Sequence, residues 1–149
     1  MSNATQPMPV LRTPRPGLCA CGQPGSSAWV PLSRSGVRTV VNLRPAAEVP
    51  DRDEAREVHD AGLAYVHIPI AGPEALTRDA AQRLQQVLLT SPPTVLVHCS
   101  SANRAGSLIA LADAWFGSRD IENALALGRD AGMSSWEPTV RALLFATHG

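Results

Sequence analysis

Four short apolar runs, separated by segments with helical periodicity, constrain this fold more than any other feature of the chain. The runs lie at 18–21, 38–43, 64–70 and 94–99, and the last three, RTVVNL, AYVHIPI and TVLVHC, are rich in β-branched residues. Runs of this length and composition, bounded by turn residues, are typical of buried strands. Their alternation with helices predicts an α/β fold, with a mostly parallel sheet of four to five strands flanked by helices.

The segments between the apolar runs carry helix signals. Residues 51–61 follow Pro50 and have acidic side chains in the first turn, where the helix dipole favours them. Thr77 fits the N-cap of a helix over 78–90 that ends before Pro92. After the last apolar run the pattern is helical only, over 104–117, over 121–131 and in a terminal helix around 136–144. We therefore expect a helical C-terminal tail.

The length of 149 residues suits one domain with one hydrophobic core. Pro7, Pro9, Pro14 and Pro16 stand among small and polar residues in the first sixteen positions, a composition that disfavours a helix. We expect 1–16 to be an extended or mobile arm that the fold can lose, and 17–149 to form a single domain.

Charge and cysteine content exclude several classes of function. All 13 basic residues are arginines scattered without a basic run, and the net charge is zero, so no nucleic-acid partner is expected. The absence of lysine excludes a Walker-type phosphate loop and Schiff-base chemistry. No stretch approaches the roughly 20 apolar residues that cross a bilayer, so we expect no membrane partner. Three cysteines without a signal-like segment indicate a cytoplasmic location.

The run TVLVHC ends at Cys99, and helical periodicity begins within about one turn, at Arg104. Ligands of parallel sheets bind beyond the carboxyl ends of strands, where the first amides of the next helix are unpaired donors. Arg104 adds a planar fork suited to phosphate, and the same field favours the thiolate of Cys99. We predict that Cys99 is a nucleophile in a loop that binds phosphate or sulfate. The phosphate-binding residues would be Ser100, Ser101, Ala102, Asn103, Arg104 and Ala105.

The stretch V-H-C-S-S-A-N-R resembles the His-Cys-(x)n-Arg loop of the protein tyrosine and dual-specificity phosphatase superfamily. It is most similar to the bacterial phosphatase-like branch that is also found fused to beta-lactamase-like hydrolases, in which four residues separate Cys from Arg. The resemblance covers roughly residues 17 to 145. Further matching blocks are Gly22-Gln23-Pro24, G-V-R-T-V-V-N-L-R-P-A-A-E at 36–48, A-G-L-A-Y-V-H-I-P-I at 61–70 and G-R-D-A-G-M at 128–133.

The resemblance implies a phosphatase-like fold and the hydrolysis of phosphate monoesters, carried by a phosphoprotein or a small ester, without metal or cofactor. Cys99 would form a phosphocysteine, Arg104 would clamp the phosphoryl oxygens, and His98 would orient the loop from behind it. Glu74 is the carboxyl nearest to the expected position of the general acid. In most of the superfamily five residues separate Cys from Arg, the loop contains Gly where Ala102 stands, and Ser or Thr follows the arginine in place of Ala105. Ser100 or Ser107 would have to supply that hydroxyl.

Several alternatives stay open at this stage. A Cys-x4-Arg turn at a strand-helix junction also occurs in rhodanese-like sulfurtransferases, and a phosphate-binding module with little turnover would keep the loop without the chemistry. A hydrogen-bonded core histidine is an equally good interpretation of His98. Cys19 and Cys21 share one strand face, and we favour core packing over a redox pair. Arg44 and Glu48 are expected to pair at the rim of the site rather than line it.

Overall fold

The sheet has five strands in the order β1-β2-β5-β3-β4. The computed structural model describes residues 9–148, the last two by their backbone alone. Strands β2 (Leu18–Cys21), β5 (Val95–His98), β3 (Thr39–Asn42) and β4 (Ala64–His67) run parallel, and β1 (Arg12–Arg15) pairs antiparallel with β2 at the edge. The predicted fold class, a mostly parallel sheet of four to five strands, is confirmed.

The two central strands are buried on both faces. Every residue of β3 and β5 is buried, as expected for runs without polar alternation. His98 of β5 lies between Cys21 and Asn42 in the register of the parallel ladder. Because β5 is the middle strand, Cys99 emerges at the centre of the carboxyl edge of the sheet.

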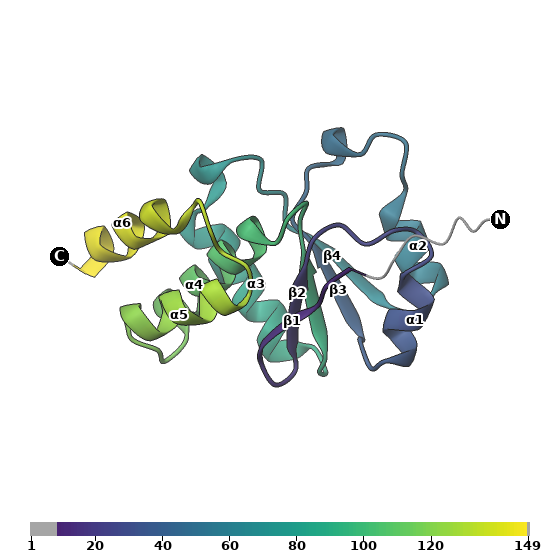
Figure 1. Ribbon diagram of the computed structural model, residues 1–149, viewed down its shortest axis with the longest axis horizontal. Helices are drawn as coiled ribbons and strands as arrows, with labels where there is room; N and C mark the ends of the chain where they lie inside the picture. The colour runs from purple at the N-terminus through teal and green to yellow at the C-terminus, as the bar shows by residue number, and fades with distance from the viewer. Residues whose placement is uncertain (1–8, 149) are drawn as a thin grey trace.

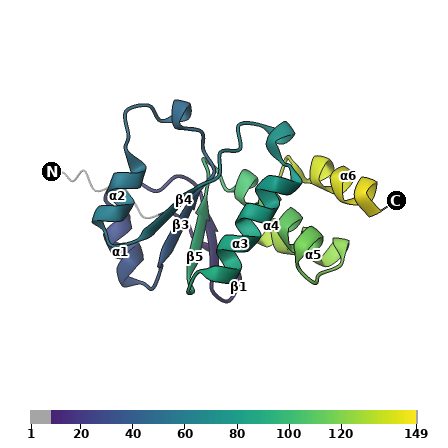
Figure 2. The same ribbon diagram turned by 180° about the vertical axis from the view of Figure 1, so that it is seen from behind.

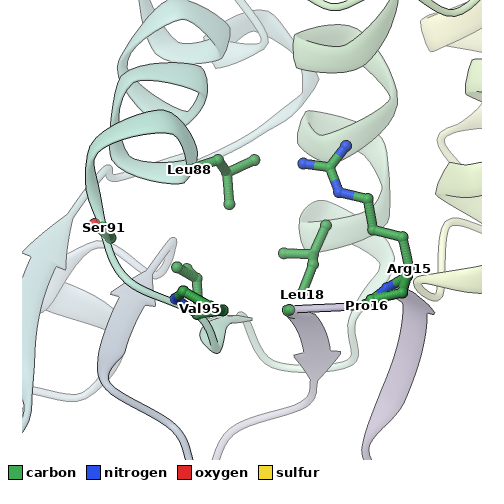
Figure 3. Close-up of a pocket in the computed structure, with 8 residues that line it drawn as sticks. Arg15, Pro16, Leu18, Leu88, Ser91 and Val95 are labelled. Atoms are coloured by element: carbon green, nitrogen blue, oxygen red, sulfur yellow. The ribbon is translucent and has the colours of Figure 1, made fainter.

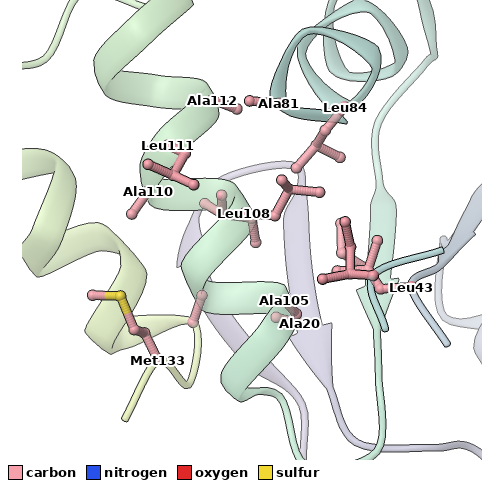
Figure 4. Close-up of a cluster of buried hydrophobic side chains, with 14 of the residues drawn as sticks. Ala20, Leu43, Ala81, Leu84, Ala105, Leu108, Ala110, Leu111, Ala112 and Met133 are labelled. Atoms are coloured by element: carbon pink, nitrogen blue, oxygen red, sulfur yellow. The ribbon is translucent and has the colours of Figure 1, made fainter. Parts of the chain in front are cut away.

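Helices form one layer on each side of the sheet (Figure 1). Helices α1 (Trp29–Arg34) and α2 (Glu54–Asp60) cover one face, where they pack with β3 and β4 around Trp29 and Leu32. On the other face lie α3 (Arg78–Thr90), α4 (Asn103–Phe116), α5 (Ile121–Asp130) and α6 (Glu137–His148). Helix α4 is the centre of that group, with every residue from 105 to 113 buried. Its Ala112 lies beside Ala81 of α3 (Figure 4), in the same core cluster as Leu108 and Leu84.

Side-chain caps fix where three of the helices begin. Thr77 accepts a hydrogen bond from the N–H of Ala80, as the sequence predicted for α3, while Asp53 caps α2 and Asp120 caps α5. The connections after β3 and β4 hold two short 3-10 helices, η1 (Ala46–Glu48) and η2 (Pro73–Ala75). Both connections rise beyond the same edge of the sheet, beside the start of α4 (Figure 2).

Some features differ from the sequence expectations. Residues 12–15, within the expected arm, form β1, whose Arg15 pairs with Asp113 of α4 at 3.1 Å, while residues 1–8 lie outside the described part of the chain. The short helix α1 was not expected. In the described chain no helix is both long and apolar enough to cross a membrane.

Candidate active site

Cys99 directly follows β5, and its backbone is still held by the sheet. Its N–H donates to the carbonyl of Cys21 at 3.3 Å, and the carbonyl of His98 accepts from Leu43 at 3.0 Å. The thiol is completely buried, in the same cluster as Ala105 and Leu108 of α4. The sulfur is therefore fixed at the point where the central strand turns into a helix.

The turn from 100 to 102 wraps around the sulfur. The N–H of Ala102 donates to Cys99 Sγ at 3.0 Å. Ala102 is in the left-handed region at φ 74° and is the N-cap of α4, which has no side-chain cap, unlike α2, α3 and α5. The first N–H groups of α4 consequently have no side-chain oxygen to donate to, as an anion site requires.

Arg104, in the first turn of α4, is held by two loops. Its Nη1 donates to Glu48 Oε2 at 3.0 Å and to the carbonyl of Ile70 at 2.9 Å, and its Nη2 donates to Glu48 Oε1 at 2.8 Å. Nη2 also approaches Ser100 Oγ at 3.5 Å. Within residues 9–148, Nε donates no hydrogen bond, so the edge formed by Nε and Nη2 keeps capacity for another anion.

Glu48 was expected only to pair with Arg44 at the rim of the site, but its carboxylate also binds the arginine of the loop. The predicted pair with Arg44 is confirmed, at 3.1 Å, and the same carboxylate also binds Arg104. Hydrogen bonds from Arg104 first, and then from Arg44, hold the pKa of Glu48 below its usual range. The carboxylate therefore stays ionised and holds the guanidinium at its far end.

His98 lies beneath the loop with no exposed surface. Its Nε2 lies 2.5 Å from Glu54 Oε2 of α2, and its ring packs 5.9 Å from that of Trp29. The histidine is thus a hydrogen-bonded core residue that also directly precedes Cys99. That it also orients the loop stays a prediction.

The segment after α5 closes the site from the side of α4. The Asn103 carboxamide oxygen accepts the N–H groups of Ser134 (2.7 Å) and Trp136 (3.3 Å), and its nitrogen donates to Ser135 Oγ at 3.1 Å. The side chain of Asn103 is therefore occupied by this connection, and only its backbone N–H is left for an anion. Gly132 lies so close to Ala102 that an added Cβ would stand 2.5 Å from the Ala102 Cβ.

Comparison with known proteins identifies the family of the chain. Residues 11–116 match the family described as the phosphatase-like domain of beta-lactamase hydrolase-like proteins. The chain belongs to this family. The resemblance stated from the loop and its flanking blocks is thereby confirmed.

Curated relatives are longer proteins. Beta-lactamase hydrolase-like protein of Xylella fastidiosa (strain Temecula1) is 34% identical over 119 residues, which are 77% of this chain and 27% of the relative. The protein of the same name from Agrobacterium fabrum (strain C58) is 31% identical over 65% of this chain and 23% of its own length. The phosphatase-like domain described here thus spans about a quarter of the relatives it matches.

Solved structures share the fold at lower identity. A Shewanella putrefaciens CN-32 protein described as a phosphatase superposes with a TM-score of 0.73 at 22% identity, over 95% of both chains. Kinase-associated phosphatase, crystallised with its catalytic-site cysteine replaced by serine, gives a TM-score of 0.73 at 12% identity, over 97% of this chain and 96% of its own. These likenesses establish a phosphatase-like fold.

The candidate acid of this phosphatase-like domain, Glu74, lies on the loop after β4. It is in η2, exposed, with its carboxylate folded back over Gly72, where an added Cβ would stand 2.5 Å from Oε2. Its role as the acid stays a prediction. The two candidate hydroxyls separate clearly, because Ser107 donates to the Asn103 carbonyl within α4 at 2.8 Å, whereas Ser100 is exposed beside Arg104.

The other two cysteines lie across the sheet from Cys99. Cys21 is buried with the cluster around Trp29, and Cys19 packs on the same face, so core packing of this pair is confirmed. Burial, and then the neighbouring Cys99, raise the pKa of Cys21 to about 12. Cys21 therefore remains a thiol. Among residues 9–148, no three His, Cys, Asp or Glu side chains gather to hold a metal ion.

Hollows elsewhere in the domain do not contain Cys99. A cavity of about 130 Å³ lies at the amino ends of β2 and β5, lined by Arg15, Leu18, Leu88 and Val95 (Figure 3). That is the sheet edge opposite to Cys99. A second hollow, of about 440 Å³, lies beside Phe145, which is 51% exposed.

Proposed function

We propose that this chain is a cysteine-dependent phosphatase that hydrolyses phosphate monoesters through a phosphocysteine. The observation that carries the proposal is the hydrogen bond from Ala102 N–H to Cys99 Sγ at the start of α4, a helix that has no side-chain N-cap and carries Arg104 in its first turn. A buried thiolate beside a helix N-terminus and a guanidinium is an activated nucleophile.

The reaction follows from this geometry in two steps. Cys99 Sγ attacks phosphorus, the bond from phosphorus to the ester oxygen breaks, and the departing oxygen takes a proton from an acid, for which Glu74 is our candidate. Water then attacks the phosphocysteine, the phosphorus–sulfur bond breaks, and inorganic phosphate leaves with the thiolate restored. The negative charge on the phosphoryl oxygens is met by the amides of 100–105 and by Arg104.

Arg104 contributes through the part of its guanidinium that the protein leaves open. Glu48 and the Ile70 carbonyl take both hydrogens of Nη1 and one of Nη2, so a phosphoryl group would meet Nε and the Nη2 hydrogen that otherwise approaches Ser100 Oγ. Two parallel donors fit two phosphoryl oxygens. Arg104→Lys would keep the charge and lose this pairing, so kcat/KM should fall by about 100-fold or more.

The test is hydrolysis of p-nitrophenyl phosphate by the wild type and by Cys99→Ser. We expect turnover with the wild type, inhibition by vanadate and no turnover with Cys99→Ser. Cys19→Ser is the matched control, since it removes a partly exposed thiol from the same sheet and should retain activity. Equal turnover by the wild type and Cys99→Ser would overturn the proposal, and so would thiosulfate-to-cyanide sulfur transfer without phosphatase activity.

A second candidate is a phosphate-binding module with little turnover. It is favoured by the complete burial of the Cys99 side chain and by Ala105, which leaves no hydroxyl at the sequence position after Arg104. Calorimetry with inorganic phosphate separates the two functions. Phosphate binding by both the wild type and Cys99→Ser, with hydrolysis by neither, would support the module.

A further inference from the structure

One unbroken chain of side-chain hydrogen bonds joins the residue before Cys99 to the arginine of the loop. From the open end, Arg104 donates to Glu48, and Glu48 Oε1 accepts Arg44 Nε at 3.1 Å. Arg44 Nη1 then donates to Gln23 Oε1 at 3.1 Å. The buried end completes the chain, with Gln23 Nε2 donating to Glu54 Oε1 at 2.9 Å and Glu54 Oε2 lying 2.5 Å from His98 Nε2.

The members of this chain come from separate parts of the sequence. Gln23 follows β2, Arg44 and Glu48 follow β3, and Glu54 is the first residue of α2. All of them lie at the carboxyl edge of the parallel sheet, around the strand that ends in Cys99. The chain thus begins and ends on the two residues that flank the reactive loop.

Gln23 is the link that gives the chain its direction. Its carboxamide oxygen can only accept and its nitrogen can only donate. The nitrogen faces the Glu54 carboxylate and the carbonyl of Pro24 (3.1 Å), and the oxygen faces the Arg44 guanidinium. The reverse orientation would set oxygen against carboxylate and nitrogen against guanidinium. Gln23 therefore has one orientation that satisfies both halves.

The two ends differ in rigidity. His98 is fully buried and the Glu54 side chain is 4% exposed, whereas the side chains of Arg104 and Glu48 are 15% and 28% exposed. A hydrogen-bonded link from a packed group to a partly exposed one restricts the rotamers of the exposed group. Arg44 and Gln23 are the only route of this kind between the two ends among the contacts of the described residues.

We propose that Gln23 and Arg44 are positioning residues of the site, which transmit the fixed geometry of the His98–Glu54 pair to Glu48 and, through it, to the guanidinium of Arg104. The inference rests on the proposed phosphatase function and deepens it. Neither residue touches the reacting atoms. Their effect is on the position of Arg104 when phosphate arrives.

The first experiment measures kcat/KM for p-nitrophenyl phosphate in Gln23→Leu. Small misplacement of a binding group is costly in rate, and we expect a loss of about 10-fold or more. Gln82→Leu, the same change at an exposed position of α3, should leave kcat/KM unchanged. Because both residues act through Arg104, the loss in the double variant Gln23→Leu/Glu48→Gln should be smaller than the product of the single losses. Strictly multiplicative losses would overturn the proposal.

The second experiment makes the link titratable. In Gln23→Glu, two carboxylates would face each other and share a proton at low pH, with Arg44, Arg52 and His98 as the other charged or titratable groups nearby. The link is then intact on the acidic side and broken by repulsion as pH rises. The kcat/KM of Gln23→Glu relative to wild type should fall with increasing pH, whereas the ratio for Gln23→Leu should be flat. Identical pH profiles for the two variants would count against the link.

A third measurement does not need turnover. Side-chain guanidinium NMR signals of Arg104, assigned with Arg104→Lys, should shift in Gln23→Leu and Gln23→Glu but not in Gln82→Leu. Unmoved Arg104 signals would overturn the inference even if the protein is a phosphatase. If the Arg104 signals shift in the Gln23 variants but the wild type does not hydrolyse phosphate esters, the proposed function is wrong and the hydrogen-bond network stands. If Gln23→Leu does not fold, Gln23→Glu at high pH, where the link is broken, supplies the same comparison.

Discussion

Gly132 lies against the loop that holds Cys99. The stability that its replacement by alanine should cost can be worked out from the structure. Gly132 is at φ +117°, where an added Cβ would stand 2.5 Å from the Cβ of Ala102 and 3.0 Å from its carbonyl oxygen. Gly36 is a matched control, because it has φ +114° and an added Cβ there would meet nothing within 4 Å. The two variants share the backbone strain and differ in the clash alone.

The expected energies follow from these two terms. A side chain at positive φ costs about 1–2 kcal/mol, so the unfolding free energy of Gly36→Ala should be lower by that amount. Overpacking a filled site adds about 1–3 kcal/mol, so Gly132→Ala should lose about 2–5 kcal/mol of unfolding free energy in total. Because Ala102 is also the residue whose N–H binds Cys99 Sγ, the folded fraction of Gly132→Ala should also lose phosphatase activity.

Urea unfolding of the three proteins measures these values, with the midpoint shifting and the slope m unchanged. Adding Ala102→Gly to Gly132→Ala removes the closest contact and should recover part of the lost stability. If Gly132→Ala and Gly36→Ala were equally destabilised, or if Ala102→Gly brought no recovery, Gly132 would not pack against the loop as described.

Three further predictions concern single side chains. The Arg104 contact holds the pKa of Glu48 low, so its carboxylate contributes stability above the ordinary carboxyl pKa of about 4 and loses it as pH falls through the lowered value. Glu48→Gln should therefore destabilise the protein near neutral pH and much less in acid, as chemical denaturation at the two pH values would show. Asn103→Ala removes the partner of two backbone N–H groups, those of Ser134 and Trp136, and should lose about 0.5–1.5 kcal/mol in the same assay, because water can reach the freed donors. If Glu74 is the acid, Glu74→Gln should lower kcat for an alkyl phosphate far more than for p-nitrophenyl phosphate, whose leaving group needs no proton, and an equal effect on both would refute the role.

Local patterns were sufficient to predict most of the fold. The β-branched runs gave the central strands, and the cap at Thr77 gave the start of α3, because both depend on short-range chemistry. β1 was not predicted, since an antiparallel edge strand of four residues with Pro14 in it carries no apolar alternation. Helix α1 was missed for a similar reason, because six residues with Pro31 inside show too little periodicity.

The sequence predicted the position of Cys99 and Arg104 at a strand-helix junction, but not what holds them. Glu48 was recognised as a partner of Arg44, four positions away, because that spacing is local, whereas its contact with Arg104 joins residues 56 positions apart. The Gln23–Glu54 and Asn103–Ser134 contacts also join residues far apart in sequence, 31 positions in each case. Such pairs follow from the order of strands in the sheet, which the alternation of elements does not determine.

The strand order explains why the blocks that carried the family resemblance are scattered along the chain. Gly22 bridges to Ser101, Glu48 and Ile70 hold Arg104, and Gly132 packs on Ala102, so each block contributes one contact to the same six-residue loop. β5 lies between β2 and β3, and the segments that follow those two strands reach the loop from either side. A short Cys-x4-Arg motif is ambiguous between phosphatase and sulfurtransferase because the loop alone does not contain these contacts. The specificity of the sequence signal therefore resides in the residues that fix the loop from outside it.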